Sequence, residues 1–570
     1  MSMGKDHGRS RALRPSAEVL EVRQMLSTTV SGMDTAGDKW TLTLLGKGAL
    51  QVLKQDDATT GQPAALNSKT EIKSITISGT DPRSTRLIGS VVPASGSEGR
   101  VFFEKLNEIP NHSDLTAGGL GVQAVNMPSF WLGYTGSTKA ATNAPVAEIN
   151  IPDGLNSLRI GGVDTTKSFT TNPSDSPTKD GQNDNYLVRL GFPYAIGTSI
   201  VVDKVISSSQ AGTTTGTTTN PATQKSVVFD VAGRINLFQA NEIDGSSTNV
   251  PAASGYTGGT IVASVPPDAV SGIPGQFGFV RIGGNATNFS VITSSQIANL
   301  YIGGETSNIS LLTPTGSRNL FFGKGFDTAS VYTHSLENLY ANRDALNSTI
   351  TSERMIGNLM IGGNVANVTA LSGYQAGLTN YFSNATSNIS NLMQGGTSLP
   401  NAATPPTPTA QANGQITAYI AGNVTNSIFA ASDLPVSQIQ TPTSQVFGEV
   451  GDAFLPLGHI TARVEGSIDN TIATPNLPKT AFYALKVDLT HGVVVPPKVV
   501  EPPLPPPTTP ITLPGIPVVF PASLSTKINS SKVNSITTGS GSGSSAKPIG
   551  ITSITNPNPK ATTQVPTKKK

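Results

Sequence analysis

Four charged side chains recur at one turn of a unit that repeats in the middle of the chain. Glu305 and Asp344 fall at the seventh position of their units, and Lys324 and Arg343 fall at the sixth. Hydrolysis of a glycosidic bond needs two carboxylates, and a polysaccharide lyase needs carboxylate-bound calcium and a base. Stacked units would separate Glu305 from Asp344 by about 9.5 Å, the upper limit for an inverting hydrolase. The residues therefore mark a candidate sugar-binding or catalytic ridge; a solvated row of salt-linked turns is the simpler interpretation.

An aromatic run, Phe130-Trp131-Leu132-Gly133-Tyr134, is a second candidate for sugar binding. Exposed rings stack against the C–H faces of sugars, whereas buried rings of the same kind form a core or a cap. Phe130, Trp131 and Tyr134 are thus carbohydrate-binding candidates only if their side chains reach the solvent.

Carboxylates in the segment 172–185 could hold a metal ion. Asp175, Asp180 and Asp184 surround a glycine, and oxygen ligands on such a loop suit calcium, although their spacing matches no established calcium loop. The chain has no cysteine, which excludes disulfides, thiolate zinc sites and a cysteine nucleophile. We predict no cofactor, with calcium as the alternative.

The ridge belongs to a repeat that occupies residues 279–371. Its coils begin at Phe279, Asn299, Asn319, Asn338 and Asn358, so the period is 19 or 20 residues. Positions 2 and 4 are apolar in every coil, which predicts a strand with one buried face. Gly-Gly follows at positions 5 and 6 in three coils and predicts a turn.

A second short strand follows in each coil. Position 10 is asparagine in four coils and Thr328 in the third, which predicts a left-handed residue and a ladder of amides. Position 12 is serine or threonine throughout, between mostly apolar positions 11 and 13, so we expect positions 11 and 13 to face inward and position 12 outward.

A unit of about 20 residues cannot bury its apolar face alone and must stack on its neighbours. We therefore predict an all-β protein, a right-handed parallel β-helix. Propeller blades need about 40–45 residues, and leucine-rich repeats need a different pattern, so neither fits. Looser coils are expected before residue 279, because Leu158-Arg159-Ile160-Gly161-Gly162 repeats the strand-and-glycine pattern.

The N-terminus carries Leu20-Glu21-Val22-Arg23-Gln24-Met25-Leu26-Ser27 and has no apolar region typical of a secretory signal. This segment resembles the N-terminal L-E-x-R-x-L-L-S motif of large, exported, repeat-rich surface proteins of Planctomycetes. Leu20, Glu21, Arg23, Leu26 and Ser27 match the motif, whereas Val22 stands where proline is usual and Met25 replaces leucine. The resemblance implies export or attachment at the cell surface. A short amphipathic helix is the alternative.

Composition limits the possible partners. Charged residues are only 13% of the chain and the net charge is +2, so nothing predicts binding to nucleic acid. No run of 18 apolar residues exists, so we predict no transmembrane segment.

These observations divide the chain into four parts. We predict an export-like segment at 1–29, a β-helix with inserted loops at 30–494, a proline-rich linker at 495–521, and a disordered tail rich in Ser, Thr, Gly and Lys at 522–570. The segments 171–185 and 207–224 lack apolar residues and are expected to protrude.

Two classes of function agree with this organisation. The first is a non-enzymatic, extracellular or cell-surface protein, structural or adhesin-like, with polysaccharide or cell-envelope components as partners. The second is a polysaccharide-active β-helix, either a lyase or a hydrolase, or a carbohydrate-binding protein that uses residues 130–134. A lateral groove in which three or more ionisable side chains converge would favour the enzyme.

Overall fold

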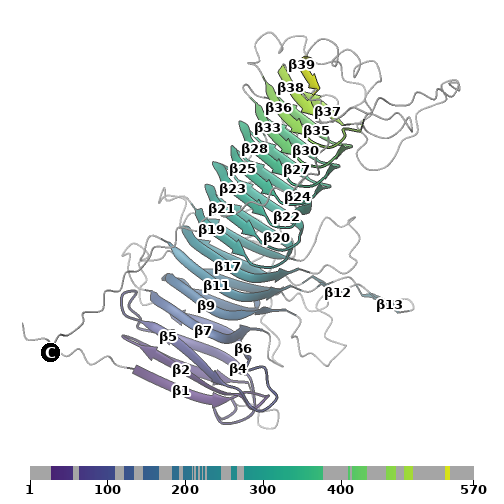
Figure 1. Ribbon diagram of the computed structural model, residues 1–570. Coiled ribbons are helices and arrows are strands. Elements are labelled where there is room, and N and C mark those ends of the chain that lie inside the picture. Colours follow the sequence, from purple (N-terminus) through teal and green to yellow (C-terminus); the bar gives the residue numbers. More distant parts are fainter. Residues whose placement is uncertain are drawn as a thin grey trace, which may run out of the picture.

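The computed structural model is an elongated stack of β-strands that rises in chain order from one end to the other (Figure 1). It describes residues 27–55, 63–109, 121–133, 145–165, 183–191, 197–245 with short gaps between 207 and 227, 259–265, 275–375, 409–432 except 411–413, 458–469, 480–491 except 485, and 533–538. Among these residues there is no helix, and thus none that could cross a membrane.

Two parallel ladders of strands run the length of the stack. Ladder 1 consists of β5 (Arg86–Val92), β7 (Val122–Leu132), β9 (Leu155–Asp164), β11 (Thr198–Ile206), β17 (Arg234–Asp244), β19 (Gln276–Ile282), β21 (Gln296–Ile302), β23 (Gly316–Phe322), β25 (Leu336–Ala341), β28 (Met355–Ile361), β33 (Gln415–Ile420), β36 (His459–Val464) and β38 (Lys486–His491).

Ladder 2 forms the opposite side of each coil. It consists of β4 (Ile72–Ser78), β6 (Val101–Ile109), β8 (Pro145–Ile151), β10 (Asn183–Leu190), β16 (Val227–Ala232), β18 (Thr260–Val265), β20 (Ala286–Thr293), β22 (Thr306–Thr313), β24 (Phe326–Thr333), β27 (Thr349–Ser352), β30 (Thr369–Ser372), β35 (Ile428–Ala431) and β37 (Ala481–Tyr483). The chain therefore alternates between the two ladders, which confirms the parallel β-helix and its start well before residue 279.

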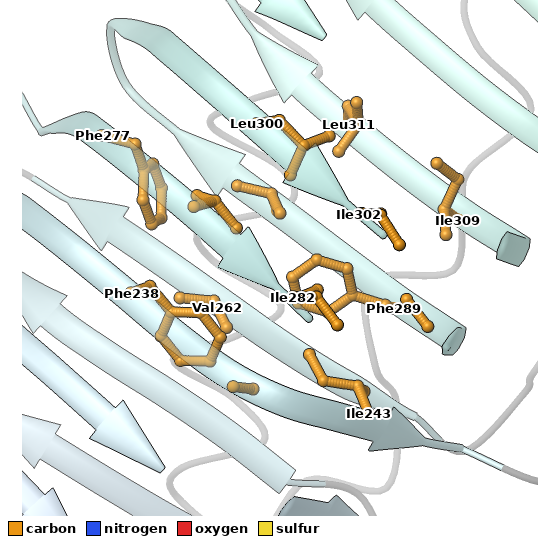
Figure 2. Close-up of a cluster of buried hydrophobic side chains, with 14 of the residues drawn as sticks. Phe238, Ile243, Val262, Phe277, Ile282, Phe289, Leu300, Ile302, Ile309 and Leu311 are labelled. Atoms are coloured by element: carbon orange, nitrogen blue, oxygen red, sulfur yellow. The ribbon is translucent and has the colours of Figure 1, made fainter. Parts of the chain in front are cut away.

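The core lies between the ladders. Leu300 and Ile302 of β21 meet Ile309 and Leu311 of β22, and all four side chains are buried (Figure 2). The same alternation buries positions 2 and 4 of ladder 1 and positions 11 and 13 of ladder 2 in the five coils, so the predicted register is confirmed. At position 11 of the fourth coil the buried residue is polar, because Ser348 stands where the other coils have an apolar residue. The Ser348 hydroxyl donates to the carbonyl of Leu346.

A left-handed residue lies at position 10 of every regular coil, inside β20, β22 and β24 and just before β27 and β30. The φ values at position 10 are between 48° and 57°, and the residues are Asn288, Asn308, Thr328, Asn347 and Asn367. Asn426, at φ 47°, continues the series. Asparagine tolerates this region better than other residues with a Cβ. The amide ladder is also present, since Asn308 donates to Asn288 and Asn367 donates to Asn347 at 2.8 Å. At the Thr328 coil the Asp327 carboxylate replaces the missing amide and accepts from Asn347 at 2.9 Å.

A buried column of hydroxyl groups closes the far end of ladder 2. Thr293, Thr313, Thr333, Ser352 and Ser372 are fully buried. Thr293 donates to the carbonyl of Gly275 at 2.7 Å, and Ser352 donates to that of Met355 at 2.8 Å. These bonds satisfy carbonyl groups where the chain turns back toward ladder 1. The sequence analysis did not predict this column.

The N-terminal end differs from the predicted boundary. The first three strands are β1 (Ser27–Met33), β2 (Lys39–Leu45) and β3 (Ala49–Lys54). They form antiparallel pairs: β1 pairs with β2, β2 also pairs with β5, and β3 pairs with β4. Within the described residues the first strand therefore starts at Ser27, ahead of the predicted boundary at residue 30, and the first strands form an antiparallel cap. The remainder of the 1–29 segment, including Leu20 to Leu26 of the export-like motif, lies outside the described residues.

The predictions for the C-terminal part of the chain concern mainly residues outside the described ones. The whole linker at 495–521 and most of the tail at 522–570 are among them. Residues 533–538 form β39 (Val533–Thr538), which pairs in parallel with β38. These six residues add a strand to ladder 1 within the tail for which the sequence predicts disorder. Ile416 of β33 pairs directly with Ile460 of β36, so these two late strands belong to adjacent coils, although their separation of 44 residues predicts about two coils.

The insert at 207–224 projects from the stack (Figure 1). Its described residues form two short antiparallel pairs, β12 (Ser209–Gln210) with β15 (Thr223–Gln224) and β13 (Thr213–Thr215) with β14 (Thr218–Asn220). The prediction of a protruding segment is confirmed here.

Candidate functional site

The outer face of ladder 1 carries a column of aromatic and apolar residues. Positions 2 and 4 of each coil point into the core, so position 3 between them points outward. Strand register joins the position-3 residues of five successive coils of the ladder, and they are Tyr301, Phe321, Tyr340, Met360 and Tyr419. The column ends in arginine on both sides, since Arg281 pairs with Tyr301 and Arg463 pairs with Tyr419.

The rings of the column are ordered by their contacts with one another. Tyr301 and Phe321 stack with centroids 5.1 Å apart and planes 1° from parallel. The face of each ring therefore lies against the other ring. Met360, which lies between Tyr340 and Tyr419 in the column, is 40% exposed and keeps the column apolar there. The Arg463 guanidinium lies 5.9 Å from the centroid of Tyr419.

A column of amides runs beside the rings at position 1. Asn319 donates to Asn299 at 2.9 Å, Asn338 donates to Asn319 at 2.9 Å, and Asn358 donates to Asn338 at 2.7 Å. The two columns are joined at Tyr340, whose hydroxyl donates to Asn338 at 3.3 Å. Each amide has two N–H donors, and the ladder uses one of them. We call these residues the outer strip: Asn299, Asn319, Asn338, Asn358, Tyr301, Phe321, Tyr340, Met360 and Tyr419.

The charged ridge predicted from the sequence is a solvated turn. Lys324 and Glu305 approach to 3.9 Å, with side chains 45% and 73% exposed. The Asp344 carboxylate accepts the backbone N–H of Asn364 at 2.6 Å, as Asn285 does from Glu305 at 2.9 Å. Asp344 thus belongs to a turn ladder at position 7. Arg343 is exposed at the same turn.

The predicted aromatic platform is inside the protein. Phe130 is fully buried in the core and Trp131 is 3% exposed. A register shift lies in β7 before Trp131, Gly161 and Gly162 leave the space that the indole fills, and the Arg100 guanidinium lies 4.6 Å from the ring centroid. Neither ring can stack on a sugar, so the platform is corrected to a packing cluster. Tyr134 lies outside the described residues.

The calcium candidates cannot be compared with the structure. Asp175 and Asp180 lie outside the described residues, and Asp184 lies in β10 at a position whose side chain is not described. Among the described residues no three His, Cys, Asp or Glu side chains are grouped as a metal site.

Two pairs of opposite charge lie side by side on the outer face of ladder 2, shifted by two residues along the strands, and neither pair was predicted from the sequence. Lys105 of β6 pairs with Glu148 of β8, and Arg189 of β10 pairs with Asp230 of β16. Arg189 Nε lies 3.8 Å from the Asp230 carboxylate. Burial raises the pKa of both carboxyls, and Arg189 opposes that rise in each. We call Lys105, Glu148, Arg189 and Asp230 the charged row.

A second buried charged group lies under the N-terminal cap. The ammonium of Lys54 donates to the carbonyl of Ser68 at 2.7 Å and lies 5.7 Å from the centroid of Trp40. Glu71 accepts a hydrogen bond from Thr35. Burial raises the pKa of Glu71 to about 7 and lowers that of Lys54 to about 8.

The sequence analysis missed both the outer strip and the charged row, but only the outer strip leaves a pattern in the sequence. The outer strip was already present in the coil alignment, because position 3 must face outward and yet carries Tyr301, Phe321 and Tyr340. The charged row was not, because inserts of different lengths separate β6, β8, β10 and β16 and hide which residues share a row.

The fold and these surfaces define a parallel β-helix with repeated outward columns. No protein-family model, curated protein or solved structure matches the chain.

Proposed function

We propose that this chain is a non-enzymatic structural or adhesin-like β-solenoid that acts at the cell surface or outside the cell. The observation that carries the proposal is the amide ladder of the outer strip, which links four successive coils with one residue type at one position. A catalytic site needs different groups converging at one place, whereas a ladder repeats the same group along an axis. Repetition suits a spacer or an adhesive surface.

Stacking gives such a body its mechanical use. Each coil contacts only its neighbours, so a solenoid can grow in length without enlarging a single core. Side-chain ladders at positions 1, 7 and 10 bond coil to coil in addition to the backbone, which favours a stiff rod. The resemblance of the N-terminal segment to an export motif supports the same location.

Surface location is tested by protease treatment of intact source cells, followed by immunodetection of the chain. Cleavage in intact cells, with a cytoplasmic marker left uncut, is the expected result. Protection until the cells are lysed would overturn the location. The non-enzymatic role is tested by incubation of the purified chain with a panel of polysaccharides. We expect no release of reducing ends or unsaturated sugars.

A polysaccharide-active enzyme is the second candidate, and the charged row favours it. Glu148 and Asp230 are two carboxyls with raised pKa values, separated by Arg189. They lie two strands and two residues apart, so their Cα atoms are about 11–12 Å from each other, and side chains that lean together could approach inverting geometry. If the panel gives products, Glu148→Gln and Asp230→Asn should each abolish them, while Glu305→Gln should leave the rate unchanged.

A further inference from the structure

We propose that the outer strip is a binding site for an extended, uncharged polysaccharide that lies along the axis of the solenoid. The inference rests on the proposed adhesive function and names its ligand class and its residues.

The spacing of the strip calls for a linear, repeating ligand. Parallel strands stand about 4.7–4.9 Å apart, so an asparagine beside an aromatic residue recurs at that interval from β21 to β25, and Asn358 beside Met360 follows in β28. A compact ligand would use one or two coils and leave the rest unused. A polymer whose units advance by a similar length meets the same pair of groups at every unit, and many weak contacts then add up along one chain.

The chemistry of the strip fits sugars. Amides beside aromatic and thioether groups offer hydrogen bonds along one column and apolar contact along the other, which matches a chain that has hydroxyl groups and C–H faces. The ladder leaves the second N–H of each donor amide without an acceptor among the described residues, and that N–H can donate to a hydroxyl oxygen. The Tyr340 hydroxyl donates to Asn338 at 3.3 Å and so lies beside the amides.

The charge of the outer strip favours a neutral polymer over an anionic one. The nine residues of the outer strip carry no formal charge. Arg318 and Glu337, one row away, pair with each other at 3.7 Å. The cations of the column, Arg281 and Arg463, are at its two ends, and Arg463 pairs with Glu465 at 2.6 Å. An anionic polymer therefore gains nothing along the middle of the strip, and a neutral polymer loses nothing there.

A second copy of the chain is the alternative occupant of the outer strip, and the test distinguishes it from a polysaccharide. An exposed apolar column could also pack against the same column of another rod. Such a contact would appear as self-association and would need no sugar.

The test measures retention of the purified full chain on insoluble neutral β-glucan, neutral mannan and anionic polygalacturonate. The strip variant combines Tyr340→Ser and Met360→Ser. The matched control combines Val201→Ser and Gln239→Ser, which change the same outward column in β11 and β17. Circular dichroism and thermal unfolding confirm that both variants are folded. Asn319→Asp is a second strip variant that keeps the size of the side chain.

We expect the native chain to bind at least one neutral polysaccharide, the strip variants to bind it about tenfold more weakly or not at all, and the control to bind as the native chain does. Equal loss in the control, or binding to polygalacturonate alone, would overturn the site. Absence of all polysaccharide binding would overturn it while leaving a surface rod standing. Sedimentation that shows a dimer in the native chain and a monomer in the strip variant, without sugar binding, would replace it by a rod–rod contact.

Discussion

The coils of residues 275–375 and those of residues 72–245 share two ladders but differ in what holds them together. The later coils are 19 or 20 residues long, with strands such as β21 and β28 of 7 residues, and side-chain ladders link one coil to the next. The earlier coils have longer strands, up to 11 residues in β7 and β17, and place ionisable groups on their outer face. The comparison shows that one backbone register can be stabilised either by repetition or by longer strands with paired charges.

Both regions accept inserts at their turns. The amide ladders continue where coils differ in length, since Asn338 donates to Asn319 over 19 residues and Asn426 donates to Asn367 over 59 residues. The outer strip lies mainly in the regular coils and continues to Tyr419 in the next coil of ladder 1. In the earlier coils the same outward column holds Ile88, Asn126, Arg159, Val201 and Gln239, which share no chemistry.

The largest effect should come from a charge in the regular core. Ile302→Asp places a carboxylate between β21 and β22, where the side chain is fully buried (Figure 2). We expect a loss of about 4 kcal/mol or more in the free energy of unfolding, with unfolding that starts in the neighbouring coils. Denaturant unfolding and hydrogen exchange measure both.

The matched control is Tyr301→Asp, one residue earlier on the outer face of the same strand. It loses one ring stack and should cost only about 1 kcal/mol. Equal costs for the two variants would contradict the register of β21.

Sequence alone was enough for the regular coils. Positions 2, 4, 10, 11, 12 and 13 were assigned correctly because the repeat shows each position five times, and Asn308 or Ile302 can be read against its equivalents. The antiparallel cap was not foreseen, because a single copy of Lys39–Leu45 alternates in the same way whichever direction its partner runs.

Side-chain sites were harder to predict than strands. Trp131 was a candidate for solvent exposure, and only the register shift in β7 and the space above Gly161 and Gly162 explain its burial. The charged row depends on the pairing of Lys105 with Glu148 and of Arg189 with Asp230, residues 43 and 41 positions apart. Contacts over such separations, across inserts of unequal length, leave no periodic signal in one sequence.

A second prediction tests whether paired charge stabilises the earlier coils. Arg189→Met keeps most of the side-chain volume and leaves Glu148 and Asp230 without their shared cation; Lys105 remains beside Glu148. We expect a loss of about 3 kcal/mol at pH 7.5, below the limit for a fully buried pair because the Arg189 side chain is 38% exposed.

The loss should depend on pH in a defined direction. Burial raises the pKa of both carboxyls, and removal of Arg189 raises it further, so the folded variant takes up protons as the pH falls. The difference from the native chain should therefore shrink between pH 7.5 and pH 4.5. A constant difference over that range would show that Arg189 acts through packing alone. Arg318→Met, at an exposed pair in the regular coils, is the control and should change stability by less than about 0.5 kcal/mol.

A third prediction concerns the cap. Burial raises the pKa of Glu71 from 4.5 to about 7, so the folded chain holds a proton there that the unfolded chain releases. Stability contributed by this group is present below pH 4.5 and is lost as the pH rises to about 7. Glu71→Gln, which keeps an acceptor for Thr35, should therefore be more stable than the native chain above pH 7, by about 2–3 kcal/mol.

Neighbouring charges limit that gain. Asp34 raises the pKa of Glu71, and Lys54 lowers it, so the variant also leaves Lys54 with less compensation. Hydrogen exchange of β1 to β4 at pH 4.5, 6 and 7.5 measures the effect locally, with residues 275–375 as the internal reference. A native cap whose protection is the same at all three pH values would contradict the assignment of Glu71.

The smallest expected effect is that of substitutions at Asn308, whose positive φ angle is a feature of the later coils. Among the described residues, non-glycine residues with positive φ begin at Asn288, and the earlier coils have none. Asn308, at φ 51°, combines a left-handed backbone with an amide bond to Asn288. Asn308→Ala should cost about 1–2 kcal/mol because alanine adopts that region poorly, while Asn308→Gly loses only the amide bond and should cost about half as much. Thermal unfolding of the two variants separates backbone from ladder: equal costs would assign the whole effect to the amide, and the regular coils would then depend on side-chain bonding alone.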